Sequence, residues 1–304
     1  MSFATPILLI AFSRPDTVSA VIDSMRLVKP AQIYVACDGP RPDIPGEHEL
    51  CRETRAVIEA SIDWPCEIHR LYRDENRGCR YGPVEAINWF FSQVEEGIIL
   101  EDDVVPSVDF YYFCQDLLTH YRSDDRIGAI GGNALAPSKV NPADSYVFSK
   151  FIQAWGWASW RRAWNHFESD MASWPAAKKS GFLGVIGGSD FARYLTACFD
   201  RAAGSNQSIW DYIWMYSTMR QGYLCCHPSR QLVANIGFDE RATHTKGGQS
   251  PLLPIQSINF PLKHPAMFIA NKAYDEEILY GHLGAQRGRV LGFFKKIIRW
   301  VCRC

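Results

Sequence analysis

Strand-like and helix-like segments alternate over the first 135 residues of this 304-residue chain. The first of them, residues 7–12, is an unbroken apolar run, which is typical of a strand that is buried on both faces. Regular alternation of this kind predicts an α/β fold with a mostly parallel, doubly wound sheet and right-handed crossovers. The expected strands are residues 7–12, 33–37, 67–71, 98–100 and 127–130, and the expected helices are residues 16–28, 53–62, 83–94 and 108–121.

Composition and motifs exclude several classes of protein. Hydrophobic residues make up 47% of the chain and charged residues 21%, which excludes a disordered chain, and a net charge of −1 argues against a general nucleic-acid binder. No G-x-G-x-x-G follows the first strand and no Walker A motif occurs, which disfavours a classical dinucleotide fold or a P-loop enzyme. The ten cysteines include no C-x-x-C pair, and no secretory signal or membrane span is visible, so we expect a cytoplasmic protein.

The second half of the chain is rich in tryptophan. Aromatic residues with few charges suit either a cleft that stacks a sugar ring or a plain hydrophobic core. We expect one helix at residues 208–221 and short strands at residues 224–226 and 232–236. We interpret residues 1–250 as one domain with a nucleotide half (1–135) and an acceptor half (136–250), followed by a C-terminal extension (251–285) and a basic tail (286–304).

Three consecutive acids, Glu101, Asp102 and Asp103, follow the strand expected at residues 98–100. Ligands in open α/β sheets bind at the carboxyl ends of strands, and adjacent carboxylates repel unless a cation lies among them. A divalent ion held by one carboxylate and by phosphate oxygens would relieve this repulsion. The alternative interpretation is a solvated turn beside a helix start.

Other polar residues are expected at the same edge of the sheet. Asp38 closes the second strand and could accept hydrogen bonds from a base or ribose, or belong to an ordinary Asp-Gly turn. Arg14, just past the first strand, could pair with a phosphate or with a neighbouring acid. Arg77 and Arg80 lie in a glycine-containing loop before a helix, which is either an anion site or a routine loop.

Two further candidates come late in the chain. Asp211 lies in the first turn of the helix expected at residues 208–221, where it could be a general base or could simply complement the helix dipole. His244 lies in a polar, glycine-bearing segment that could close over a nucleotide, although a lone histidine is more often structural.

The order and spacing of these motifs resemble a GT-A type glycosyltransferase. They are close in pattern to the N-acetylglucosaminyltransferase I-like family (alpha-1,3-mannosyl-glycoprotein beta-1,2-N-acetylglucosaminyltransferases) and to its bacterial relatives. The resemblance covers residues 5–248. The matching stretches are residues 8–14, the strand ending in Asp38, Tyr81 and Gly82, Glu101 to Asp103 with residues 106–113, Trp155-Gly156-Trp157, Trp210-Asp211 with Trp214, and residues 237–244.

The resemblance implies a role for each matching residue. Asp103 would be the ligand of Mn²⁺ or Mg²⁺, with Glu101 and Asp102 nearer the ribose and the sugar. The donor would be a nucleotide sugar that is UDP-linked, and Asp211 would take the proton from the acceptor hydroxyl in an inverting displacement. This chain departs from the family there, since the family has two adjacent acids where this chain has Asp211 followed by Tyr212. The remaining donor-binding residues implied are Arg14, Asp38 (which would contact the uracil), Arg77, Tyr81, Trp155, Gly156, Trp157 and His244.

The basic tail lies outside the resemblance. Its apolar residues recur at helical spacing between lysines and arginines, which indicates either a helix at a membrane surface or a terminal helix docked on the domain. A glycosyltransferase with a glycan or lipid-linked saccharide acceptor could therefore sit on the inner face of a membrane. Two other functions stay open, a sugar-nucleotide nucleotidyltransferase and a non-catalytic protein that binds membrane surfaces. Residues 10–16 contain no glycine, which counts against the nucleotidyltransferase.

Overall fold

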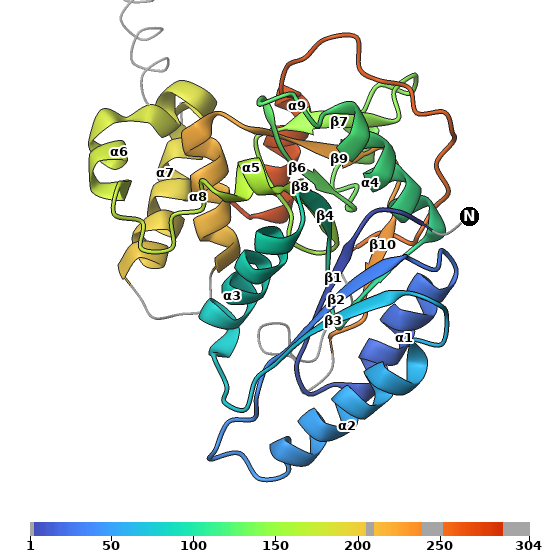
Figure 1. The fold of residues 1–304 in the computed structure, drawn as a ribbon. Helices are drawn as coiled ribbons and strands as arrows, with labels where there is room; N and C mark the ends of the chain where they lie inside the picture. Colours follow the sequence, from blue (N-terminus) through green and yellow to red (C-terminus); the bar gives the residue numbers. More distant parts are fainter. Residues whose placement is uncertain (1–2, 205–209, 239–251, 288–304) are drawn as a thin grey trace, which may run out of the picture.

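A mixed eight-stranded sheet with helices on both faces forms the centre of the computed structural model, which describes residues 3–204, 210–238 and 252–287 (Figure 1). The strand order is β3-β2-β1-β4-β8-β6-β9-β7. Strands β3, β2, β1 and β4 are mutually parallel, β8 runs antiparallel to both β4 and β6, β9 is parallel to β6, and β7 is antiparallel to β9. The α/β fold with a mostly parallel sheet is therefore confirmed.

The strands follow the apolar runs of the sequence where they are buried on both faces. Their bounds are β1 (Ile7–Ala11), β2 (Gln32–Cys37), β3 (Glu67–Tyr72), β4 (Glu96–Glu101), β6 (Ile127–Gly131), β7 (Tyr146–Ser149), β8 (Trp157–Trp160) and β9 (Leu224–Pro228). A separate antiparallel pair is formed by β5 (Val104–Pro106) and β10 (Val233–Asn235).

The helices divide between the two faces of the sheet. Helices α1 and α4 pack with Ile7 and Leu9 on one face, and α3 and α8 pack with Leu8 and Ile99 on the other (Figure 1). Alternate residues of a strand point to opposite faces, so each central strand supplies both cores. The bounds are α1 (Pro15–Arg26), α2 (Glu47–Ser61), α3 (Gly78–Gln93), α4 (Val108–His120), α5 (Arg161–Trp164), α6 (Trp174–Ser180), α7 (Phe182–Gly204), α8 (Trp210–Gln221) and α9 (Lys272–Glu277).

Two helix predictions were wrong. Helix α3 begins at Gly78 instead of Pro83, because the backbone N–H groups of Arg77 and Gly78 are bound by a side chain from another part of the chain, Asp38. The second half holds several helices instead of one. Glycines hide α7 in the sequence, and at Gly188 (φ +83°) two helical segments meet across a kink.

Both halves of the chain contribute strands to the one large sheet, since β7, β8 and β9 extend the sheet that β1 to β4 begin. The extension also packs on this unit, because the Tyr274 hydroxyl accepts a hydrogen bond from Leu135 N (3.1 Å) and Asp275 accepts one from Ser149 Oγ (2.6 Å). The division into a nucleotide half and an acceptor half stays a prediction. Within the residues described, none of the helices has the length and apolar character to cross a bilayer, and the tail from residue 288 onward lies outside them.

Candidate functional site

The residues expected to bind a nucleotide gather at the carboxyl ends of the central parallel strands. Ile10 of β1 is aligned with Glu101 of β4, and Ala11 of β1 with Cys37 of β2. The residues that follow these strands, including Asp38, therefore lie at one edge of the sheet. This edge is where parallel sheets place their ligand sites.

Two of the three consecutive acids are held by groups that follow β1. The carboxylate of Asp102 accepts a hydrogen bond from Phe12 N (3.0 Å at Oδ2). Asp103 forms an ion pair with Arg14, with 2.6 Å between Oδ2 and Nη1, and only 13% of the Arg14 side chain and 14% of the Asp103 side chain are exposed. Of the two partners that the sequence offered for Arg14, the structure shows the neighbouring acid, and pairing with a phosphate stays a prediction.

A strand from late in the chain covers this ion pair. Strand β10 pairs with β5, and beyond the pair Ile236 N donates a hydrogen bond to Asp103 O (2.9 Å). A Cβ atom at Gly237 would lie 1.9 Å from Asp103 Oδ2 and 2.8 Å from Arg14 Nη1. Only glycine allows this approach of the backbone without moving the two charged side chains. His244, the other candidate of this segment, lies outside the described residues.

Burial and mutual repulsion perturb the acids. Burial, followed by the charges of Asp103, Asp102 and Asp211, raises the pKa of Glu101 well above its ordinary value. Burial and the Asp103 charge raise the pKa of Asp102 to about 7. Arg14 opposes both shifts. Asp211, in the first turn of α8, therefore comes within electrostatic range of Glu101 although 110 positions separate them in the chain.

The raised pKa of Asp102 predicts a pH dependence of stability. Between about pH 4 and pH 7 the folded protein holds a proton that the unfolded chain has released, so the free energy of unfolding falls as the pH rises through this window. In EDTA, we expect the Tm of the wild type to fall between pH 4.5 and pH 7.5, and the slope to be shallower in Asp102→Asn. The exposed Asp43→Asn variant should keep the wild-type slope. An equal slope in Asp102→Asn would contradict this account.

The acids suit a hard divalent cation in their donor chemistry. Mn²⁺ and Mg²⁺ prefer carboxylate oxygens, and an ion here would offset the repulsion that raises the pKa of Glu101. Among the described residues, however, no group of three or more His, Cys, Asp and Glu side chains converges to hold a metal. The residues therefore fit the binding mode in which one or two carboxylates hold an ion that phosphate oxygens also ligate.

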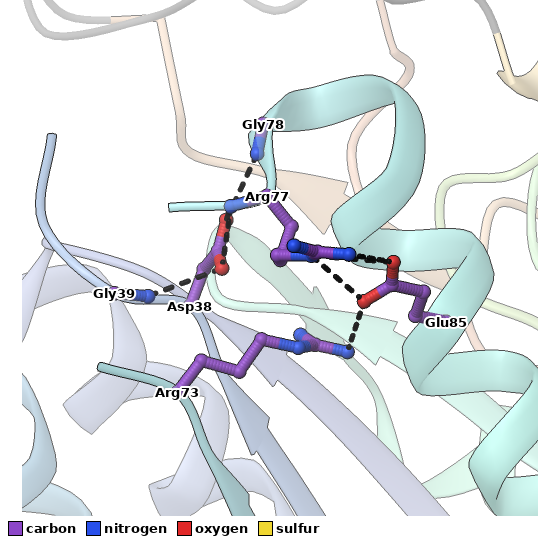
Figure 2. A network of polar contacts seen from close by, with 6 residues as sticks. All are labelled: Asp38, Gly39, Arg73, Arg77, Gly78 and Glu85. Atoms are coloured by element: carbon purple, nitrogen blue, oxygen red, sulfur yellow. Dashed lines mark hydrogen bonds and ion pairs between the residues drawn. The ribbon is translucent and has the colours of Figure 1, made fainter. Parts of the chain in front are cut away.

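Asp38 has a structural role that the sequence did not reveal. Figure 2 shows its carboxylate at the N-terminus of α3, where Oδ1 accepts hydrogen bonds from Gly39 N (3.1 Å) and Arg77 N (3.0 Å) and Oδ2 accepts one from Gly78 N (3.2 Å). Burial nevertheless raises the pKa of Asp38. This carboxylate caps the helix, and contact with a base, as the resemblance implies, stays a prediction.

Acidic side chains of the protein engage the N-terminus of α3 and the Arg77 side chain. The N–H groups at the start of α3 point to Asp38, and the Arg77 side chain pairs with Glu85 (3.1 Å), which Arg73 also approaches (3.4 Å; Figure 2). Tyr81 is half-exposed, with the Arg80 guanidinium over its ring. The donor-binding roles of Arg77 and Tyr81 stay predictions.

The tryptophan segment divides between the core and the site. Trp157 is 1% exposed and packs against Trp164, Trp210 and Trp214, with ring centroids 6.0–6.3 Å apart, so its side chain belongs to the core and does not line a cleft. Trp155 is half-buried and meets Phe238 edge to face at 6.2 Å. Phe238 follows Gly237 in the segment that the sequence analysis singled out, so this aromatic pair lies next to the backbone that covers Asp103.

Gly156 permits a close approach between its own backbone and strand β10. Its φ is +68°, and a Cβ there would lie 2.9 Å from a methyl carbon of Val233 in β10. Glycine here lets β10 pack against the Trp155 segment. The donor-binding role that the resemblance implies for Gly156 stays a prediction.

A buried amide pair fixes the segments around the site. Gln231 donates hydrogen bonds from Nε2 to Asn133 Oδ1 (3.0 Å) and Val233 O (2.7 Å) and accepts one from Ala134 N (2.8 Å), and Asn133 donates one to Trp155 O (3.0 Å). Neither side chain is more than 1% exposed. These bonds join the loop after β6, the Trp155 segment and β10. Single amides have no sequence pattern, so nothing in the sequence identified them.

Comparison with known proteins gives similarities of fold alone. No protein-family model matches the chain, and no curated protein sequence matches it, so membership of the N-acetylglucosaminyltransferase family stays a prediction. Similar solved structures include a cytidylyltransferase from Leptospira borgpetersenii serovar Hardjo-bovis, with 8% identity and a TM-score of 0.35 over 56% of this chain and 65% of that one. The chain thus spans less than two thirds of that protein.

Two others have comparable scores. One is 4-diphosphocytidyl-2C-methyl-D-erythritol synthase from Anaerococcus prevotii (11% identity, TM-score 0.38, 78% of this chain and 92% of that one). The other is mouse xyloside xylosyltransferase 1 (9% identity, TM-score 0.38, 72% of this chain and 83% of that one). Two of the three are transferases by name and one is a synthase, and similarities this low carry no argument about the function of this chain.

Proposed function

We propose that the chain is a metal-dependent glycosyltransferase. It would transfer a hexosyl or N-acetylhexosaminyl group from a UDP-linked sugar to a hydroxyl of a glycan or glycolipid, with inversion. One observation carries the proposal: Glu101, Asp102 and Asp103 at the end of β4 are joined by Asp211 from α8, and burial and repulsion raise the pKa of Glu101. A protein keeps such a destabilising group of acids where a cation or a proton transfer needs it.

The acids divide into two roles. Asp103, with Glu101 and Asp102 beside it, would hold a divalent ion that supplies charge stabilisation for a departing nucleoside diphosphate. Arg14 adds a positive charge at the same place, since it pairs with Asp103. Asp211 comes from a different element and stays half-buried, which suits a base that takes the proton of the attacking hydroxyl.

The aromatic pair supports a sugar substrate. The half-buried rings of Trp155 and Phe238 lie beside the segment that covers Asp103, and aromatic faces bind the apolar face of a sugar ring. The buried amide of Asn133 donates a hydrogen bond to Trp155 O, and that of Gln231 donates one to Val233 O, so the two amides hold both segments in place.

The proposal is tested with a panel of nucleotide sugars in the presence of Mn²⁺, Mg²⁺ or EDTA. We expect one class of nucleotide sugar to raise the Tm only when a divalent ion is present, and the same donor to be hydrolysed slowly without an acceptor. Donor binding that is equal in EDTA would contradict the metal dependence. Release of pyrophosphate from a nucleoside triphosphate and a sugar 1-phosphate would identify a nucleotidyltransferase instead.

A further inference from the structure

The Asp103 carboxylate, which is proposed to hold the ion, already carries a positive group of the protein. Arg14 Nη1 lies 2.6 Å from Asp103 Oδ2, and both side chains are largely withdrawn from solvent. A charge-assisted hydrogen bond of this length is strong, and screening by water is small at this exposure.

Charge competition follows from the closeness of the pair. A divalent ion on the Asp103 carboxylate would lie within a few ångströms of the guanidinium on Oδ2, and two cations at that separation repel strongly in a site with little water. The backbone of Gly237 also lies close, since a Cβ there would fall 1.9 Å from Asp103 Oδ2 and 2.8 Å from Arg14 Nη1. An ion on Asp103 and the Arg14 side chain therefore compete for the charge of one carboxylate.

The backbone of Arg14 is anchored at the start of α1. Arg14 is the residue before α1, and its carbonyl accepts hydrogen bonds from Val18 N (3.1 Å) and Thr17 Oγ1 (3.4 Å). A long arginine side chain on an anchored backbone can reach a second partner near the first. Its planar guanidinium has several donors, and these match the oxygens of a phosphate.

We propose that Arg14 is an exchangeable counter-ion for Asp103. It holds the carboxylate as the structure shows, and when a divalent ion takes Asp103 it moves to the diphosphate of the nucleotide. This inference rests on the proposed function, because it takes Asp103 as the ion-binding residue. It adds a coupling: the ion and the nucleotide each favour the released form of Arg14, so each strengthens the binding of the other.

The experiment measures two affinities in matched variants. Arg14→Met keeps the length of the side chain and removes its charge, and Arg122→Met is the control, because Arg122 pairs with Glu96 at the opposite end of β4. Without nucleotide, Arg14→Met should bind Mn²⁺ about tenfold more tightly than the wild type, by electron paramagnetic resonance of free Mn²⁺. With saturating Mn²⁺, it should bind UDP about tenfold more weakly, by calorimetry, and Arg122→Met should match the wild type in both.

The outcomes separate this inference from the proposed function. If the wild type binds Mn²⁺ and Arg14→Met binds it equally or more weakly, Arg14 does not compete with the ion and the inference is overturned while the ion site stands. If neither protein binds Mn²⁺ with or without UDP, the ion site and the inference both fall.

A measurement on the unmutated protein covers the case in which Arg14→Met does not fold. The Arg14 Nε–H resonance, assigned by its loss in Arg14→Lys or through correlations with its own backbone, is followed by NMR as Mg²⁺ and then UDP are added. We expect the resonance to shift and its hydrogen exchange to quicken with Mg²⁺, and to be protected again when UDP is added. An unchanged Arg14 resonance under saturating Mg²⁺ would overturn the inference.

Discussion

Asp103→Asn is expected to abolish metal-dependent donor binding and to lower the rate of sugar transfer by about 10²–10³-fold, the usual effect of removing one electrostatic contact to developing charge. The amide keeps the shape of the carboxylate but loses the charge that pairs with Arg14 at 2.6 Å and would hold the ion. The fold should persist, because β5 binds β10 through backbone groups that the substitution does not touch.

The measurements for Asp103→Asn are the thermal shift with nucleotide sugar and Mn²⁺ and the rate of transfer. Asp125→Asn is the matched control, since Asp125 is 85% exposed and far from β4's carboxyl end in the chain. Full donor binding in Asp103→Asn, with a Tm that still responds to Mn²⁺, would refute the assignment of the ion to this carboxylate.

Asp211→Asn is expected to separate chemistry from binding. Removal of a general base lowers kcat by about 10²–10⁴-fold. The affinity for the donor in the presence of Mn²⁺ should stay within a few-fold of the wild type. The residues proposed to hold the ion and the diphosphate, Asp103 and Arg14, come from other elements. The loss of one negative charge near Glu101 should also lower the pKa of that carboxyl, since Asp211 is among the charges that raise it.

This variant is checked by separate determination of kcat, of the KM for the donor and of the Tm. The exposed Asp170→Asn serves as its control. If Asp211→Asn transfers sugar at the wild-type rate, Asp211 is not the base. A variant that loses donor binding as much as turnover would place Asp211 with the ion-binding acids instead.

The sequence predicted the part of the fold in which local pattern and burial agree. Strands β1, β2 and β4 are continuous apolar segments between helices, and such runs are buried whatever the rest of the chain does. The sequence analysis missed strand β8, because a four-residue segment with two tryptophans is as typical of the lining of a ligand site as of a buried strand. Its two tryptophans are fully buried, as a strand between β4 and β6 requires.

The candidate site was predictable where it depends on strand ends and not where it depends on contacts between distant segments. The acids after β4 and Arg14 after β1 lie together because parallel strands end at one edge. The cap that Asp38 provides to α3 depends on a loop that returns 39 positions later, and no local pattern encodes it. The hydrogen bond between the Gln231 and Asn133 side chains joins residues 98 positions apart, and it is specified only by the folded structure.

The pairing of β5 with β10 also has a consequence for biosynthesis. Asp103 is synthesised 134 residues before Gly237, whose backbone closes over it. A nascent chain therefore contains the acids well before it contains the segment that covers them. Enclosure of the Arg14–Asp103 pair has to wait until the ribosome has made β10 and the residues that follow it.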